Sequence, residues 1–186
     1  MTQKNPMPVR TADLKVPVSE SDHQIGLPAA PLTLVEYGDF DCRFCSQAHS
    51  VVEALRARFG KNLRFVFRHN PRGDLHPHAR LAAAASEAAA LQGKFWGMHD
   101  LLFANPNVLE EPDLLRYARL LELDAAQFAV DLHSHAVAKR VRDDEVGGAH
   151  SSIISTPTFF INGMQFHGTP DFETLESAIG ALIPEH

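Results

Sequence analysis

The sequence predicts an α/β fold in which a β–α–β unit and a β–β–α unit are separated by a block of helices. Two observations predict it. Short β-favouring runs near both ends of the chain alternate with amphipathic stretches, and the segment between Asn70 and Ile153 has almost entirely helical apolar spacing. The length of 186 residues suits one domain of moderate size. We therefore expect a single domain over 26–186 with a helical insertion at about 75–150, preceded by a flexible segment, 1–25.

The composition excludes several classes of protein. With 45% hydrophobic and 22% charged residues, the chain is too apolar for overall disorder. A formal net charge of −6 indicates no basic surface for nucleic acid, and no apolar run approaches the roughly 18–20 residues that span a bilayer. The first 25 residues lack the apolar core of a secretory signal. We expect a cytoplasmic protein that is not membrane-embedded, periplasmic or extracellular only if a targeting segment had been removed.

The first half of the chain reads as strand, helix, strand. Leu32–Tyr37 is a short β-favouring run of the kind buried in a parallel sheet. An amphipathic helix is expected from Cys45 to Phe59, and Leu63–Arg68 alternates again as a second strand. Such a unit requires parallel strands and a right-handed crossover. Upstream, one short edge strand is expected at Leu14–Val18.

The rest of the chain is a helical block followed by a hairpin and a last helix. The block is expected to form three helices, at His78–Phe103, Glu111–Leu123 and Ala125 to about Val146. Gly147-Gly148 is expected to end the third helix. Two strands then flank Asn162-Gly163, a strong hairpin signal because both positions tolerate positive φ. Thr169 is expected to cap the final helix.

The only two cysteines form the motif Cys42-Arg43-Phe44-Cys45. A structural disulfide is not expected in a cytoplasmic setting, where thiols stay reduced. Taken alone, the motif is compatible with a redox-active dithiol, half of a zinc site, or two incidental cysteines.

The element order, with Cys-x-x-Cys directly after the first strand, resembles the thioredoxin superfamily. The helical insertion narrows the resemblance to its DsbA-like branch. The similarity runs from about Leu32 to Leu182 and is closest in VEYGDFDCRFC, KFWGMHDLLF and STPTFFINGMQFHG. It implies a thioredoxin fold and a thiol–disulfide oxidoreductase that exchanges disulfides with protein, peptide or small thiols such as glutathione. It implies no cofactor beyond the cysteine pair.

Cys42 is the expected nucleophile and Cys45 the resolving cysteine. Cys42 lies where the strand meets the helix, so free N–H groups of the first turn and the helix dipole favour its thiolate. Arg43 adds a neighbouring cation, which is expected to lower the pKa of the Cys42 thiol. The i, i+3 spacing brings the two sulfurs close enough to bridge.

Glu36 is an acid in the middle of an apolar strand, and burying an unpaired carboxylate is costly. The resemblance implies an acid beneath the site that exchanges a proton with the deeper cysteine. We expect burial to raise the pKa of Glu36, which then shuttles a proton for Cys45. The alternative is that Glu36 points outward from an exposed edge.

Four residues are candidates for substrate binding. The resemblance implies that Thr156-Pro157 has a cis peptide bond and lies opposite the cysteines, where the Thr156 backbone pairs with an extended substrate. The alternative is a trans proline that begins an edge strand. Phe40 and Phe44 flank the cysteines and suit an aromatic rim for apolar substrate segments, although Phe44 fits the helix core equally well.

The histidines offer a competing interpretation. His69, His76 and His78 could in principle complete a Cys2His2 zinc site with Cys42 and Cys45. Their positions in the sequence do not predict that they lie near the cysteines, and the chain has no second Cys-x-x-Cys motif. We therefore expect no metal.

Two other functions stay open. One is a glutathione-linked transferase or isomerase on the same scaffold, although relatives of that kind often replace the cysteine pair. The other is a non-enzymatic redox-sensing or metal-binding module. The pair Arg43-Phe44 also departs from the family pattern, in which proline commonly occupies the first position between the two cysteines. This departure leaves the direction of electron flow open.

Overall fold

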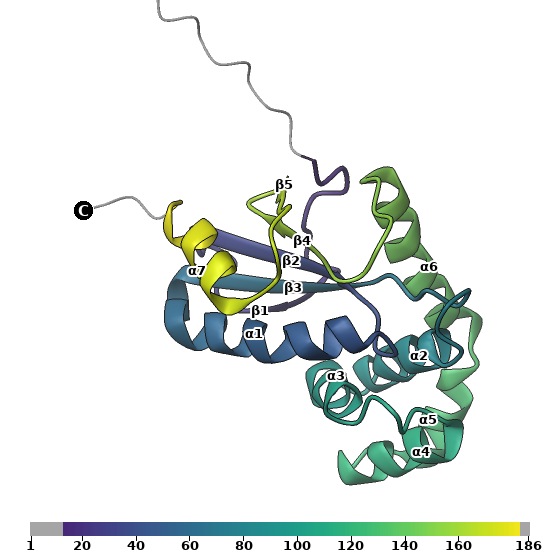
Figure 1. Ribbon diagram of the computed structural model, residues 1–186. Coiled ribbons are helices and arrows are strands. Elements are labelled where there is room, and N and C mark those ends of the chain that lie inside the picture. The colour runs from purple at the N-terminus through teal and green to yellow at the C-terminus, as the bar shows by residue number, and fades with distance from the viewer. Residues whose placement is uncertain (1–12, 183–186) are drawn as a thin grey trace, which may run out of the picture.

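A computed structural model describes residues 13–182 and shows a five-stranded sheet with helices on both faces and at one end (Figure 1). The strands are β1 His23–Ile25, β2 Leu32–Gly38, β3 Leu63–His69, β4 Thr158–Ile161 and β5 Met164–Gln165. Their order in the sheet is β1-β3-β2-β4-β5. The central β2 and β3 are parallel, as the predicted crossover requires, and the other pairs are antiparallel.

The helices divide into those that cover the sheet and those that extend beyond it. They are α1 Arg43–Phe59, α2 Ala79–Ala90, α3 Phe95–Ala104, α4 Glu111–Leu120, α5 Ala125–Leu132, α6 His135–His150 and α7 Phe172–Gly180, with a short 3-10 turn at Gly60–Asn62. Helices α1 and α7 pack together beside the sheet, and α6 returns to β3. Helices α2–α5 lie beyond the sheet in Figure 1. Helices α2–α6 thus occupy the predicted insertion.

Strand β2 separates two apolar clusters because its side chains alternate between the faces of the sheet. Leu32 and Leu34 belong to the larger cluster, which continues through α1 into the inserted helices. Val35 and Tyr37 belong to a smaller cluster on the opposite face. Alternation places Glu36 on the same face as Leu34, toward α1.

The N-terminal predictions need correction. The edge strand is His23–Ile25, antiparallel to β3, and not Leu14–Val18. The prediction of a flexible 1–25 segment is wrong for 13–25, which packs against the sheet, while 1–12 lies outside the described residues.

Residues 13–25 pack against the sheet because they bind the buried guanidinium of Arg68. It donates to Asp22 at 2.7 Å and to the carbonyl oxygens of Val16 and Pro17 at 2.8 and 3.0 Å. A buried cation needs such partners, and the preceding segment supplies them.

Several helix boundaries also differ from the predictions. The expected helix His78–Phe103 is broken near Gly93, which has φ of 74°. The third predicted helix is broken at Ser134, whose side chain accepts from the N–H of Val137 and caps α6. Helix α6 then runs through Gly147-Gly148 to His150, so the predicted end at this pair is wrong. The glycines let the helix lie close to Tyr37, whose ring a Cβ atom at Gly148 would meet at 3.2 Å.

The C-terminal hairpin is confirmed, but the cap of the last helix is wrong. Asn162 and Gly163 adopt positive φ values of 48° and 82° between β4 and β5. Helix α7 begins at Phe172 and is capped by Asp171, which accepts from the N–H of Thr174 at 2.8 Å, and not by Thr169.

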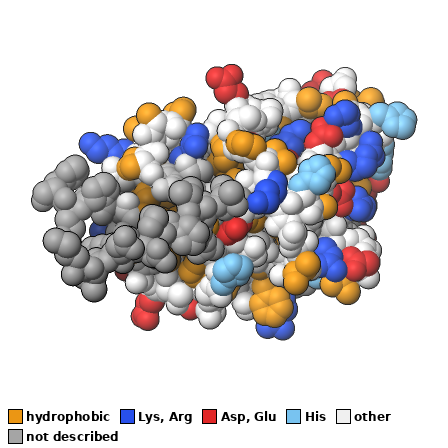
Figure 2. Space-filling model, turned by 90° about the horizontal axis from the view of Figure 1, so that it is seen from above, with side chains coloured by type: hydrophobic (Ala, Val, Ile, Leu, Met, Phe, Trp, Pro, Cys, Tyr) orange, Lys and Arg blue, Asp and Glu red, His pale blue; other side chains and the backbone are white. Residues whose placement is uncertain are grey.

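The surface carries mixed charge. On the face shown in Figure 2, basic, acidic and apolar side chains are interspersed. Within residues 13–182, no helix has the length and apolar character needed to cross a membrane.

Candidate active site

The two cysteines lie at the junction between β2 and α1. Cys42 is the N-cap residue of α1 and Cys45 lies in its first turn. Both are free thiols; Cys45 is fully buried, whereas 3% of the surface of Cys42 is exposed. The N-terminus of a helix favours a thiolate at Cys42, as the sequence predicts.

The surroundings push the pKa values of the two thiols apart. The pKa of Cys42 is lowered to about 5, chiefly by a hydrogen bond from the Cys45 thiol, which together with the N–H groups of Cys45 and Phe44 outweighs burial. The pKa of Cys45 is raised well above its usual value by burial and by its contact with Cys42. Near neutral pH, Cys42 is therefore a thiolate and Cys45 a thiol.

Arg43 does not supply the main cause of this difference. Its side chain is exposed and its guanidinium lies 5.3 Å from the centre of the Phe44 ring. The low pKa of Cys42 arises chiefly from hydrogen bonds, and a tuning role of Arg43 stays a prediction.

Glu36 is buried beneath the site. It lies on β2, an inner strand between β3 and β4, so the alternative of an exposed edge position is wrong. Burial, followed by the charge of Cys42, raises the pKa of Glu36 to about 8. Among the described residues, none forms a hydrogen bond with its Oε1 atom. The charge of Glu36 also raises the pKa of Cys45, after burial and the contact with Cys42.

The loop before β4 lies against Cys42. The Thr156–Pro157 peptide bond is cis, as the resemblance implies. Sγ of Cys42 lies 3.5 Å from the carbonyl oxygen of Thr156, to which it can donate when Cys42 is protonated. The structure thus brings Thr156 and the nucleophile together, and both loop residues are only partly buried.

The two phenylalanines have different environments. Phe44 is 57% exposed and adjoins Cys45 on the surface of α1, where it can form part of a rim. Phe40 is only 1% exposed, with its ring 5.2 Å from that of Phe67 and 4.7 Å from that of Phe103. The predicted rim position of Phe40 is therefore wrong, because its ring belongs to the apolar core.

Sequence reasoning missed Asp39. Its side chain is fully buried and accepts hydrogen bonds from the N–H groups of Asp41 and Arg72, at 2.9 and 2.8 Å, and from Nδ1 of His76 at 2.7 Å. The signal was available in the acid that directly follows the strand and in the later His-x-His motif. Neither feature predicts a contact between the acid and the histidine, because 37 positions separate Asp39 from His76.

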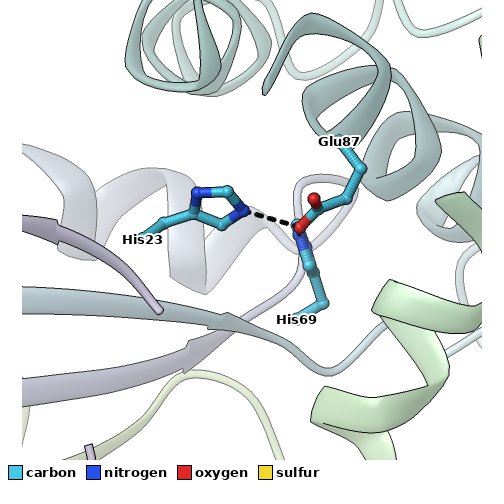
Figure 3. A group of neighbouring side chains, drawn as sticks. All are labelled: His23, His69 and Glu87. Carbon is cyan, nitrogen blue, oxygen red and sulfur yellow. Dashed lines mark hydrogen bonds and ion pairs between the residues drawn. The ribbon is translucent and has the colours of Figure 1, made fainter. Parts of the chain in front are cut away.

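The candidate zinc ligands are not gathered around the cysteines. His69 instead meets His23 and Glu87, as Figure 3 shows, and both histidine Nε2 atoms lie 2.8 Å from Oε1 of Glu87. The pKa of Glu87 is lowered, burial being outweighed by these two contacts, so its carboxylate accepts from both rings. Arg140 lies 3.9 Å from the same oxygen. The two hydrogen bonds and the nearby guanidinium thus compensate for the burial of the Glu87 carboxylate.

The other two histidines lie beside the active-site loop. His76 donates to Asp39, and the N–H of His78 donates to Asp41 at 2.9 Å. A second group of potential metal ligands consists of His49 on α1 and of His99 and Asp100 on α3. Neither potential metal-binding group found within residues 13–182 contains a cysteine, so the alternative Cys2His2 arrangement is not assembled there.

Comparison with known proteins agrees with the fold. The family model described as thioredoxin matches residues 18–181. Among solved structures, a thioredoxin-like oxidoreductase from Silicibacter pomeroyi has a TM-score of 0.78 at 26% identity, covering 88% of this chain and 92% of that one. Oxidised BdbD from Bacillus subtilis gives 0.75 at 24% identity, over 86% and 91%. Wolbachia pipientis α-DsbA1 gives 0.78 at 22% identity, over 92% and 96%.

The curated relatives are longer proteins. The chain is 47% identical over 168 residues to a protein called Na(+)/H(+) antiporter NhaA 1 from Salinispora arenicola, covering 90% of this chain and 26% of that protein. It is 45% identical over 178 residues to the protein of the same name from Mycolicibacterium gilvum, covering 95% and 29%. The chain thus spans between a quarter and a third of the length of these relatives.

Proposed function

The chain belongs to the thioredoxin family, and from that membership we propose that it is a thiol–disulfide oxidoreductase whose redox-active groups are Cys42 and Cys45. The observation that carries the proposal is the pair of adjacent thiols with opposite pKa shifts, one poised to attack or leave and one protonated and buried. No cofactor beyond the dithiol is needed for thiol–disulfide exchange.

In the oxidising direction, the reaction begins with the Cys42–Cys45 disulfide. A substrate thiolate attacks Sγ of Cys42, a substrate–Cys42 disulfide forms, and the Cys42–Cys45 bond breaks. Cys45 leaves as a thiolate and takes a proton. A second substrate thiolate then attacks the substrate sulfur of the mixed disulfide, so Cys42 leaves as a thiolate. The substrate loses two electrons and the cysteine pair gains them.

Glu36 is suited to supply the proton that Cys45 needs. Its pKa of about 8 keeps it protonated at neutral pH, and it lies on the face of β2 that points to α1. Proton transfer to the departing Cys45 thiolate and return of that proton in the reverse reaction fit a group whose pKa is near the working pH.

The low pKa of Cys42 favours the oxidising direction. A stabilised thiolate is a good leaving group and stabilises the reduced form of the pair, which makes the disulfide a stronger oxidant. The antiporter names belong to proteins of which this chain matches only a part, and ion transport is not part of the proposal.

Protein or peptide thiols are the proposed substrates. Exposed apolar side chains lie on the three segments that form the site: Phe44 is 57% exposed, Leu75, next to His76, 64%, and Ile154, before Thr156, 84%. They suit apolar segments of incompletely folded chains, and the carbonyl of Thr156 offers a hydrogen-bond acceptor to an extended backbone. A cytoplasmic location and the use of glutathione as a small thiol are also proposals, tested by fractionation and by glutathione turnover.

The direct experiment is turnover of a peptide dithiol with an added oxidant. We expect wild-type protein to oxidise it, the Cys42→Ser variant to be inactive, and Cys45→Ser to accumulate a mixed disulfide visible by mass spectrometry. Turnover by Cys42→Ser would overturn the proposal. Zinc content of the purified protein, measured in parallel, tests the metal-binding alternative.

A further inference from the structure

The loop between β3 and α2 is fastened to the loop that carries the cysteines. Asp39 is the centre of this connection, since its buried carboxylate accepts from Nδ1 of His76 at 2.7 Å and from the N–H of Arg72 at 2.8 Å. On its own loop it accepts from the N–H of Asp41 at 2.9 Å. Both carboxylate oxygens are thus engaged, which fixes the side chain.

The backbone of Asp39 reaches both cysteines. Its N–H donates to Sγ of Cys45 at 3.4 Å, and its carbonyl oxygen accepts from the N–H of Cys42 at 3.2 Å. The residue whose carboxylate binds His76 therefore also contacts the sulfur of Cys45 and the backbone of Cys42.

The charges around His76 favour its imidazolium form. His76 binds Asp39 at 2.7 Å, and the negative charges of Asp41 and Cys42 on the active-site loop and of Asp74 on its own loop also act on it. Burial lowers the pKa of His76, but the hydrogen bond and charge of Asp39, followed by the charge of Cys42, outweigh it and raise the pKa. A quarter of the His76 side chain is exposed, so it can exchange protons with water.

The nearest arginine does not replace this cation. The guanidinium of Arg72 donates to Asp74, with contacts of 3.2 and 3.1 Å, and to the carbonyl oxygen of Ile154 at 2.6 Å, and forms no hydrogen bond with the Asp39 carboxylate. Only its backbone N–H reaches Asp39.

We propose that His76 is a positioning residue of the dithiol site: its ion pair with Asp39 holds the loop against the Cys45 sulfur and the Cys42 backbone, and its positive charge stabilises the thiolate of Cys42. This inference rests on the proposed function, because it assigns His76 to the same cysteine pair. In exchange, Cys42 leaves with a negative charge, and a fixed cation nearby favours that step.

The coupling must be reciprocal. If the imidazolium of His76 stabilises the Cys42 thiolate, then the thiolate must stabilise the imidazolium by the same free energy. The pKa of His76 should therefore fall whenever the thiolate is removed, whether by mutation or by formation of a disulfide.

An NMR titration of His76 tests this without altering its side chain. We expect the pKa of His76 to be higher in the reduced wild-type protein than in Cys42→Ser. The ring signals of His133, which lies 3.0 Å from Glu111 in another histidine–carboxylate pair, should not differ between the two proteins. Equal His76 values in the two proteins would overturn the proposal.

A second test measures Cys42 through its alkylation rate as a function of pH. Glutamine at position 76 can still donate to Asp39 but carries no charge, so His76→Gln should raise the pKa of Cys42 and slow its alkylation at pH 5. The matched control, His133→Gln, should leave the profile unchanged. A wild-type profile in folded His76→Gln contradicts the proposal. Neither test measures turnover. Failure of the proposed enzymatic function would appear in the peptide-oxidation assay, and failure of the role of His76 would appear in these two tests.

Discussion

The Sγ atom of Cys42 lies 3.5 Å from the carbonyl oxygen of Thr156, a residue 114 positions further along the chain. The fold makes this contact because β4 pairs with β2 in the sheet, which brings the loop before β4 to the end of β2 where α1 begins. The nucleophile thus lies beside a backbone acceptor for an extended substrate.

The reactivity of Cys42 should persist in mild acid. Because its pKa is lowered to about 5, its alkylation rate should rise as pH increases through 5 and then level off, whereas an ordinary thiol keeps gaining reactivity up to about pH 8.5. Alkylation with iodoacetamide, read by mass spectrometry, checks this. A rate that still climbs steeply between pH 7 and 9 would contradict the assignment.

Replacing Glu36 by glutamine should stabilise the reduced protein at neutral pH but not in acid. Burial raises the pKa of Glu36 from 4.5 to about 8, so the folded state keeps a proton that the unfolded state releases. The stability contributed by the protonated group is complete below pH 4.5 and is lost as pH rises toward 8. Glu36→Gln avoids a loss of up to about 3 kcal/mol at pH 7.

Urea unfolding at pH 4 and pH 7 measures this difference. The variant should also exchange disulfides more slowly and lose the component of the rate profile near pH 8, because it holds no proton to transfer. Equal effects of the substitution on stability at both pH values, with an unchanged rate profile, would argue against a buried acid.

Phe40 and Phe44 form a matched pair of the same residue type. Phe40→Ala should lower the free energy of unfolding by about 3–5 kcal/mol, because its ring is buried among core aromatics. Phe44→Ala should change stability by less than about 0.5 kcal/mol but raise KM for an apolar peptide substrate. Chemical denaturation and steady-state kinetics separate the two effects, and a stability loss shared equally by both variants would contradict the structure.

The docking of the N-terminal segment depends on the Asp22–Arg68 pair, whose side chains are only 5% and 3% exposed. Asp22→Asn leaves the Arg68 charge without its carboxylate and should cost about 3–5 kcal/mol. The exposed pair of Asp143 and Lys139 provides a control, and Asp143→Asn should cost less than about 1 kcal/mol. Similar losses for the two variants would mean that residues 13–25 are not held by this buried pair.

Local patterns predicted the parts of the site that lie close together in sequence. The Cys42–Cys45 spacing, the acid in an apolar strand at Glu36 and the Asn162-Gly163 turn each depend on neighbouring residues alone. The resemblance added the cis bond at Pro157, which its own sequence context would not indicate.

What sequence reasoning missed depends on contacts across the fold. The Asp39–His76 hydrogen bond joins two loops, the burial of Phe40 depends on the inserted helix that carries Phe103, and the docking of 13–25 depends on the depth of Arg68 in the sheet. Periodicity records which face of an element is apolar but not which element covers it.

The central claim is that Cys42 and Cys45 form a reversible disulfide couple, and its reduction potential tests that claim most directly. The protein would be equilibrated in glutathione buffers, alkylated and analysed by mass. We predict a single two-electron transition at a potential more positive than roughly −220 mV, the upper end of the cytosolic glutathione poise. A potential within or below the range of roughly −220 to −320 mV would contradict the oxidising direction. Absence of a disulfide at every glutathione ratio would contradict the redox function itself.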